Sequence, residues 1–258
     1  MSSSNDSISK TLIVAFSLCI VCAVFVSSAA VLLKPAQEIN KTLDRKRNIL
    51  AAAGMLEEGK SVEEQFSKVT TRVVDLRTGK FSDDVDPAKY DQRKAAKDPS
   101  ESTELTAEQD KAKISRRENY ALVYVVEDNA GSLDKIILPI HGYGLWSTLY
   151  GFIALEADAN TVAGLGFYEH GETPGLGGEV DNPRWKGIWP GKKVYRDDEV
   201  AIKLMKGSVD PSNPSADWQI DGLAGATLTS TGVTHLVQFW LGENGFEPFL
   251  ENLKSGEA

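Results

Sequence analysis

The apolar stretch from Leu12 to Leu33 constrains this chain most, because only small Ser and Cys residues interrupt it. About 20 apolar residues suffice to cross the hydrocarbon core of a bilayer as one helix. We therefore expect a transmembrane helix over residues 12–33, after a cytoplasmic N-terminus over residues 1–11. A cleaved signal peptide is the alternative, since residues 27–30 are the small residues Ser-Ser-Ala-Ala. The stretch is longer than a usual signal h-region, which favours an uncleaved anchor.

Basic residues near this stretch are distributed unevenly. Only Lys10 precedes it, whereas five Lys and Arg residues follow it closely. By the positive-inside rule, this distribution favours a cytoplasmic location for the large C-terminal part. The five residues that follow are Lys34, Lys41, Arg45, Lys46 and Arg47.

Charge and cysteine content exclude several classes of function. A net charge of -9 over 258 residues argues against nucleic acid or an anionic surface as a partner. The only two cysteines, Cys19 and Cys22, lie within the apolar stretch, so the rest of the chain has no disulfide framework and no thiolate zinc site. An intramembrane iron-sulfur or redox pair would need further ligands. We favour an interpretation of both cysteines as small apolar helix residues.

The remaining sequence predicts an α+β fold with a largely antiparallel sheet and flanking helices, because runs of hairpins come before helices. We expect a helix over residues 36–55 and a strand within 66–76. The charged segment 82–117 is predicted to be either a solvated helix or a mobile surface insertion. The turn at residues 128–131 predicts a hairpin of the runs 120–126 and 135–140. Further strands are expected at 151–156 and 162–168, with 200–205 and 218–220 as the remaining edges of the sheet.

A short Gly-containing turn, residues 221–227, comes directly before a predicted amphipathic helix. Gly222 and Gly225 permit backbone conformations that other residues avoid, and the turn ends in the hydroxyl of Thr227. Free N-H groups at a helix N-terminus favour an anion such as a phosphate. An ordinary helix cap fits the same residues. The apolar face of the helix consists of Val233, Leu236, Val237, Trp240 and Leu241.

Two more Gly-rich segments, 141–146 and 169–178, have the composition of loops that border a flat ligand. Trp146 can equally be a core aromatic residue. His170, with Glu169 and Glu172, could form a metal site or act as a general base, but one His with two Glu at this spacing is a weak ligand pattern. We therefore predict no metal site and no catalytic residue.

Nucleophilic catalysis by Thr227 is a further alternative, with His235 or Asp221 as the base. His235 lies about two helical turns further along the predicted helix, so its imidazole does not readily reach Thr227. The hydrolase interpretation is therefore weak.

The run Asp221-x-x-Ala224-Gly225-Ala226-Thr227 resembles the acceptor motif of periplasmic flavin transferases, Asp-x-x-(Ser/Thr)-Gly-Ala-Thr. Ala224 stands where the motif usually has Ser or Thr. Over nearly its whole length, the chain resembles the family of the C subunit of the sodium-translocating NADH:quinone oxidoreductase. That family is closely related to the G subunit of the Rnf complex.

The resemblance implies an electron-transfer flavoprotein in which FMN is joined to Thr227 by a phosphoester. Thr229 and Ser230 are alternative acceptors. It further implies an FMN-binding domain over residues 120–258, after a helical and charged connecting region over residues 34–119. Asp221 would serve recognition by the flavin transferase. The other residues implied to bind the cofactor are Gly144, Leu145, Trp146, Glu172, Thr173, Leu176, Gly225, Ala226, Leu228 and Thr229.

The same resemblance implies a place in a six-subunit inner-membrane complex that passes electrons from NADH to ubiquinone and exports Na⁺. Partners would be the other subunits, the lipid bilayer and, during maturation, the flavin transferase. The large domain would lie on the periplasmic side, against the charge distribution. An alternative from a different class is a membrane-tethered periplasmic module that binds an anionic metabolite noncovalently and has no redox role.

Overall fold

The computed structural model describes residues 7–258, so residues 1–6 of the predicted cytoplasmic N-terminus lie outside the described residues. The chain divides into two compact units, one ending at Asp44 and the other spanning Arg45–Ala258. Helix α1 (Ile8–Ala52) contains the apolar stretch and is, among the described helices, the one long and apolar enough to cross a membrane. The predicted N-terminal apolar helix and the predicted helix over 36–55 are thus confirmed as parts of one element.

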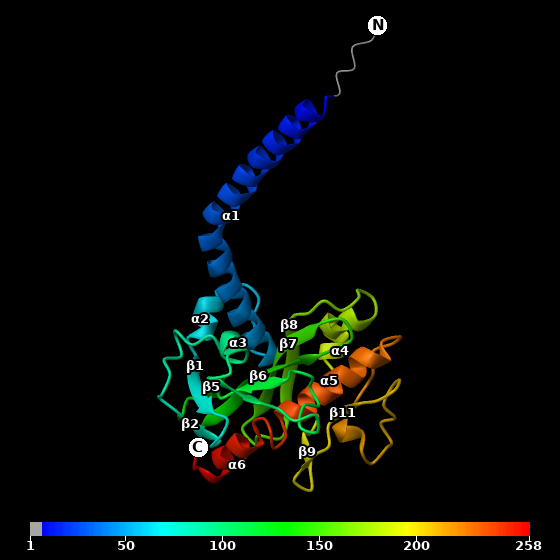
Figure 1. Cartoon of the computed structure of the whole chain (residues 1–258). Helices are drawn as coiled ribbons and strands as arrows, with labels where there is room; N and C mark the ends of the chain where they lie inside the picture. The colour runs from blue at the N-terminus through cyan, green and yellow to red at the C-terminus, as the bar shows by residue number, and fades with distance from the viewer. Residues whose placement is uncertain (1–6) are drawn as a thin grey trace. The chain divides into compact units, whose positions relative to one another are not determined.

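The second unit is built on a six-stranded antiparallel sheet in the order β2-β1-β5-β6-β7-β8 (Figure 1). The predicted strands within 66–76, at 151–156 and at 162–168 and the hairpin around residues 128–131 are confirmed. The strands are β1 (Val69–Asp75), β2 (Lys80–Phe81), β5 (Tyr120–Glu127), β6 (Leu133–Tyr143), β7 (Thr148–Glu156) and β8 (Val162–Glu169).

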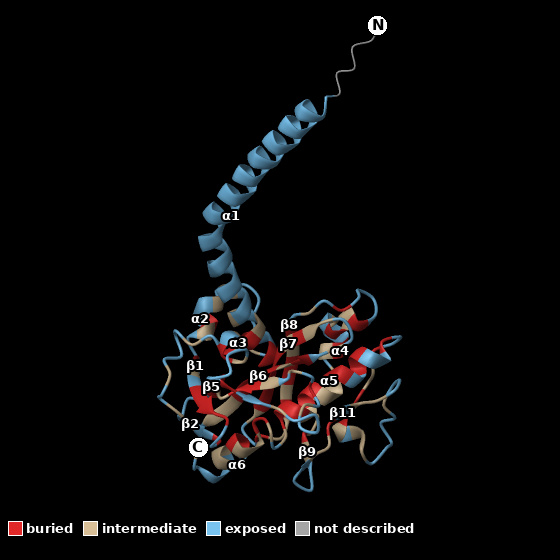
Figure 2. Cartoon of the chain, viewed as in Figure 1, coloured by how far each residue is buried: buried red, intermediate tan, exposed pale blue. Residues whose placement is uncertain are grey.

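Alternating side chains of the central strands enter two separate cores, one on each face of the sheet. On β6, Ile136 packs in one core while Ile137 packs in the other. The first core includes the apolar faces of α5 (Thr227–Trp240) and α6 (Glu247–Ser255), and α5 lies across this face of the sheet. The second core contains the last turn of α1 together with α2 (Val62–Phe66). Figure 2 shows that buried residues concentrate in the sheet and in α5.

Short strand pairs lie outside this sheet. The prediction that residues 200–205 and 218–220 form its remaining edges is wrong, because β11 (Lys203–Leu204) and β12 (Gln219–Ile220) pair with each other in parallel. The backbone N-H of Leu204 donates to Thr234 Oγ1 of α5 at 3.0 Å instead of joining an edge of the sheet. The other short elements are α3 (Gln92–Ala95), β3 (Ser102–Glu104), β4 (Arg116–Glu118), η1 (Gly177–Asp181), α4 (Pro183–Lys186), β9 (Tyr195–Arg196), β10 (Glu199–Val200) and η2 (Ala216–Trp218).

The charged segment 82–117 is neither a solvated helix nor a mobile surface insertion. It contains α3 and strand β3, and its residues Gln92 and Ala95 are buried. Gln92 Oε1 accepts a hydrogen bond from the backbone N-H of Leu122 on β5 at 2.9 Å, so the segment is fastened to the sheet. The sheet also takes in β1 and β2, so the folded unit extends beyond residues 120–258. The placement of the FMN-binding domain at 120–258 stays a prediction.

Glu118 makes the stability of this unit depend on pH. Its carboxyl is fully buried and accepts a hydrogen bond from Gln92 Nε2 at 2.5 Å. Burial raises the pKa of Glu118 from its ordinary value of 4.5 to about 7, because the loss of hydration outweighs the hydrogen bonds from its own backbone N-H and from Gln92 and the charge of Arg117. Between these two values the folded state holds more protons than the unfolded state. Stability should therefore decrease as the pH rises from about 4.5 to about 7.

We predict that Glu118→Gln stabilises the chain at pH 8 by up to roughly 3 kcal/mol, because the amide needs no ionisation in the buried site. At pH 4.5 the two proteins should have nearly the same free energy of unfolding. Urea unfolding of the full chain in detergent at both pH values measures this difference. A substitution effect of the same size at both pH values would contradict the prediction.

Candidate functional site

Helix α5 begins at Thr227, directly after the predicted turn. Gly225 has φ +71°, the left-handed conformation that glycine adopts readily. Ser230 Oγ accepts from the N-H of Leu223 at 3.0 Å and donates to the carbonyl of Ala226 at 3.1 Å, which fixes the turn to the helix. Among the described residues no side chain caps α5, and its first turn has no acidic residue, so no side chain occupies the first N-H groups of the helix. The side chain of Thr227 is exposed.

The carboxylate of Glu172 joins three separate parts of the chain. Its Oε1 accepts from the backbone N-H groups of Leu145, Trp146 and Ser147 at 3.1, 2.9 and 3.3 Å. Its Oε2 accepts from Thr229 Oγ1 at 2.7 Å. Glu172 is only 5% exposed and Thr229 is fully buried. We call residues 144–147, 172–177 and 225–229 the three site segments.

Glycine is required where these segments approach most closely. A Cβ on Gly177 would lie 2.5 Å from Thr229 Oγ1 and 2.7 Å from Glu172 Oε2. A Cβ on Gly232, one turn into α5, would lie 2.6 Å from the carbonyl oxygen of Tyr143. Gly177 therefore leaves room for the side chains of Glu172 and Thr229, and Gly232 lets α5 pack against the backbone of Tyr143.

The exposed apolar side chains of the second unit gather at the site segments. Six large apolar side chains in Arg45–Ala258 are exposed, and five of them lie on or beside these segments. Trp146 is 67% exposed and Leu228 is 61% exposed, so the interpretation of Trp146 as a core aromatic residue is wrong. Exposed apolar groups gathered in this way are typical of a binding site. The five are Tyr143, Leu145, Trp146, Leu176 and Leu228.

Glu172 is held in its ionised form. Burial opposes ionisation, but the hydrogen bonds from Thr229 and from the N-H groups of Trp146, Leu145 and Ser147 outweigh it, so the pKa of Glu172 lies below its ordinary value. A buried negative charge is therefore part of the site at neutral pH.

Other predicted site residues have mainly backbone roles in this arrangement. The carbonyl of Thr173 accepts from the N-H groups of Leu176 and Gly178, which forms the turn that presents Leu176. Asp221 Oδ1 accepts from the N-H of Val209 at 2.7 Å, and its carbonyl accepts from Trp185 Nε1 at 2.9 Å. Asp221 thus lies at the base of the turn that leads to Thr227.

His170 does not pair with the glutamates beside it. Its Nε2 lies 2.8 Å from Asp181 Oδ2, and its Nδ1 accepts from the N-H of Glu172 at 3.2 Å. Glu169 forms an ion pair with Arg93 at 2.7 Å. Within residues 7–258 no three His, Cys, Asp or Glu side chains are grouped as metal ligands.

Ser147 has a role in the site that the sequence did not indicate, and His141 lies in strand β6 rather than in the predicted loop. Ser147 supplies one N-H to Glu172, and its Oγ accepts from the N-H of Gly171 at 2.6 Å, so it ties two parts of the site together. His141 stacks on Tyr150, with ring centroids 5.5 Å apart. Burial and the charge of Arg93 lower the pKa of His141 to about 4, so this ring is an uncharged packing residue at neutral pH. No sequence pattern distinguishes Ser147 from other loop serines.

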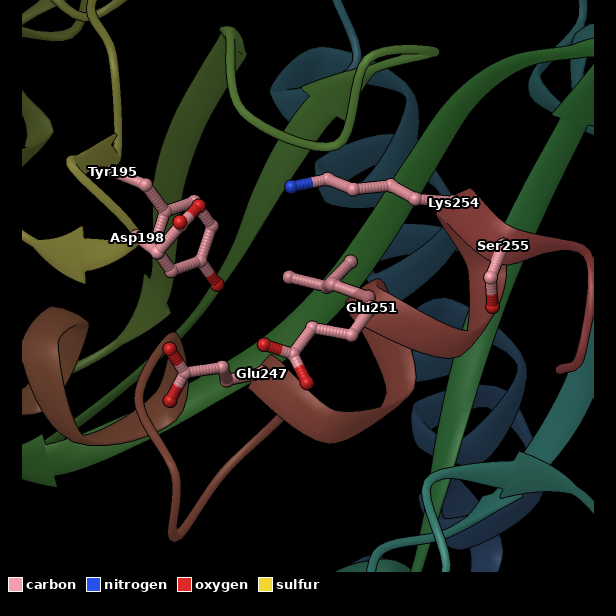
Figure 3. A pocket seen from close by; sticks show the side chains of 7 residues that line it. Tyr195, Asp198, Glu247, Glu251, Lys254 and Ser255 are labelled. Atoms are coloured by element: carbon pink, nitrogen blue, oxygen red, sulfur yellow. The ribbon is translucent and has the colours of Figure 1, made fainter.

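A separate pocket lies between α6 and the β9–β10 hairpin, away from the site segments. Figure 3 shows Lys254, Glu247 and Glu251 of α6 facing Tyr195 and Asp198. Lys254 Nζ lies 5.0 Å from the centroid of the Tyr195 ring, whose hydroxyl donates to the carbonyl of Leu241 at 2.7 Å. None of the residues predicted to bind the cofactor lines this pocket.

Comparison with known proteins agrees with this geometry. The model of the FMN-binding domain family matches residues 144–242, which include all three site segments. This match defines the class as proteins with an FMN-binding domain. The C subunit of the Na⁺-translocating NADH-quinone reductase of Pseudomonas aeruginosa is 57% identical to this chain, with 98% of this chain and 99% of the relative covered. The corresponding subunit of Vibrio anguillarum is 50% identical, with 99% of each chain covered.

A solved structure supports the same assignment. The crystal structure of Shewanella oneidensis NqrC matches with a TM-score of 0.77 and 38% identity, covering 84% of this chain and 99% of that chain. The chain therefore belongs to the NqrC family, the C subunits of the Na⁺-translocating NADH-quinone reductase. The resemblance and the fold class inferred from the sequence are both confirmed.

We predict that Gly232→Ala displaces α5 from the segment at Tyr143, because the added Cβ meets a backbone oxygen at 2.6 Å. The cost of such overpacking is about 1–3 kcal/mol in the free energy of unfolding. Gly166→Ala on β8 is the matched control, since a Cβ there meets nothing within 4 Å. Thermal and urea unfolding of the full chain compare the two variants. Equal stability of Gly232→Ala and Gly166→Ala would contradict the assigned packing.

Proposed function

We propose that this chain is an electron-transfer subunit that carries FMN joined to Thr227 by a phosphoester. The observation that supports this most strongly is the position of Thr227. Its side chain is exposed at the first residue of α5, and five exposed apolar side chains lie on or beside the site segments. The match of residues 144–242 to the FMN-binding domain supports the choice of ligand.

The start of α5 suits the phosphate of FMN. A phosphodiester keeps one negative charge, which the free N-H groups and the positive end of the helix dipole stabilise. The absence of an acidic residue from the first turn of this helix removes a source of repulsion. Gly225 and Ala226 supply the turn without side chains that would cover the hydroxyl of Thr227.

Thr227 is a better acceptor than its two neighbours. The hydroxyl of Thr229 is fully buried and donates to Glu172, and Ser230 is buried and hydrogen-bonded to the turn. Neither can reach a phosphate or a transferase active site without breaking these contacts. Asp221, at the base of the turn, is the residue that we assign to recognition by the flavin transferase.

The exposed apolar side chains suit the isoalloxazine ring. Leu145, Trp146 and Leu176 would cover its faces and exclude water. Gly144 would support this arrangement by leaving room for Glu172, and Thr173 by forming the turn that presents Leu176. When bound, FMN supplies the electron transfer itself. The chain's residues hold and orient the cofactor, and the chain has no substrate of its own.

We further propose that the chain works in a six-subunit inner-membrane complex that passes electrons from NADH to ubiquinone and exports Na⁺. The names of its relatives, which are subunits of a Na⁺-translocating NADH-quinone reductase, support this role. The apolar part of α1 would anchor the chain in the bilayer at residues 12–33. We place the large domain on the periplasmic side, because the family resemblance implies this side. The flanking basic residues do not exclude it, since long domains can be translocated in spite of them.

A noncovalent periplasmic binder of an anionic metabolite remains the second candidate, supported by the same free N-H groups at the start of α5. The two candidates differ in the bond to the ligand. A flavin that stays with the denatured chain supports the first, and a colourless chain from a host that contains the flavin transferase supports the second.

We predict that Thr227→Val abolishes covalent flavin while the fold persists, because valine has nearly the shape of threonine and lacks the hydroxyl. Flavin fluorescence of the denatured band in a gel measures attachment. Thr231→Val is the matched control, since the hydroxyl of Thr231 is exposed and bonds within the helix, to the carbonyl of Thr227. Full fluorescence in Thr227→Val would show that another residue is the acceptor.

The proposed orientation predicts that the second unit is accessible from the periplasm. Protease added to spheroplasts should cleave within residues 45–258 of the native chain, and cleavage should not require lysis. Protection until the membrane is broken would place the domain in the cytoplasm, as the distribution of basic residues indicates.

A further inference from the structure

We propose that Glu172 is a positioning residue whose ionised carboxylate holds the three site segments together and places a buried negative charge in the FMN site. This inference rests on the proposed FMN site. It differs from the expectation that Glu172 lies against the ring as a simple contact, because both of its carboxylate oxygens are engaged within the protein.

The three N-H groups that donate to Glu172 Oε1 belong to consecutive residues, Leu145, Trp146 and Ser147. Consecutive N-H groups that point to one place form a concave anion site, and here a side chain of the same protein fills it. Removing the carboxylate would leave these three N-H groups pointing to one place with no acceptor there. The segment that presents Leu145 and Trp146 would then lose this conformation.

The second oxygen connects this segment to α5. Glu172 Oε2 accepts from Thr229 Oγ1, two residues after Thr227. The conformation of segment 144–147 and the position of the acceptor helix are therefore set by one carboxylate. Gly144 and Gly177 show how tightly Glu172 is enclosed, since a Cβ on either would lie 2.7 Å from one of its oxygens.

The charge of Glu172 is stabilised by neutral donors. Four hydrogen bonds, three from backbone N-H groups and one from a hydroxyl, hold it in the ionised state. No ion pair among the described residues neutralises it. A buried negative charge without an ion-pair partner opposes the addition of an electron to a nearby group.

The first experiment uses the full chain made without the flavin transferase, so that it does not depend on FMN. Hydrogen exchange of the N-H groups of residues 145–147 should be at least about ten-fold faster in Glu172→Ala than in the native chain. The reason is that all three N-H groups lose their common acceptor and become open to water. Glu172→Gln, which retains one acceptor oxygen, should restore part of the protection. Glu179→Gln is the matched control, because Glu179 lies in the same region but bonds Asn182. Equal protection in Glu172→Ala and the native chain would overturn the proposal.

The second experiment uses the chain made together with its flavin transferase. Glu172→Ala should carry less covalent flavin than the native chain, and the flavin that attaches to Glu172→Gln should have a higher reduction potential than native. The potential is a readout that a purely structural role would not move. Native flavin content in Glu172→Ala, or a native potential in Glu172→Gln, would overturn the proposal while leaving the acceptor Thr227 unaffected. Absence of flavin from the native chain would instead overturn the proposed function and, with it, the assignment of Glu172 to an FMN site.

Discussion

The packing of α5 against the end of β6 determines where every part of the site lies. Trp240 Nε1 donates to the carbonyl of His141 at 2.6 Å, and Gly232 lets the helix approach Tyr143 at backbone distance. The contact at Gly232 lies one turn into the helix and the contact at Trp240 lies at its far end. Together they fix the direction of α5 across the sheet. As a result, Thr229 near the start of α5 reaches Glu172, which holds the loop that follows β6.

Neutral hydrogen-bond donors stabilise negative charge at two places in the site. A phosphate at Thr227 would be stabilised by free N-H groups at the start of α5. The carboxylate of Glu172 is stabilised by N-H groups of the loop after β6 and by the hydroxyl of Thr229. Backbone donors are neutral and fixed in place, so the arrangement can hold anions close to a redox cofactor without introducing mobile charged side chains.

Much of the fold was predictable because its signals are local. Apolar, β-branched runs identified the central strands, the Asp-Asn-Ala-Gly turn identified the hairpin, and the spacing of Val233, Leu236 and Trp240 identified α5. The predicted edge strands failed because the hydroxyl of Thr234 holds the N-H of Leu204, a contact between distant residues. The segment 82–117 was misjudged because its buried anchors, such as Gln92, are polar residues in a charged composition.

The site residues were suggested by motif and by resemblance, but their physical roles were not. Glu172 receives its hydrogen bonds mainly from backbone N-H groups, and every residue except proline has one, so no sequence pattern reveals which of them converge. The close approach at Gly177 is likewise a property of the folded chain. Glycine content indicated loops, and only the fold shows which glycine faces Glu172.

The central claim is that Thr227 carries the cofactor, and peptide mass spectrometry of the chain purified from its own membrane tests it most directly. We expect the peptide containing residues 221–240 to be heavier by the mass of FMN less one water, with fragment ions that place the addition on Thr227. An unmodified peptide, or an addition on another residue, would contradict this claim.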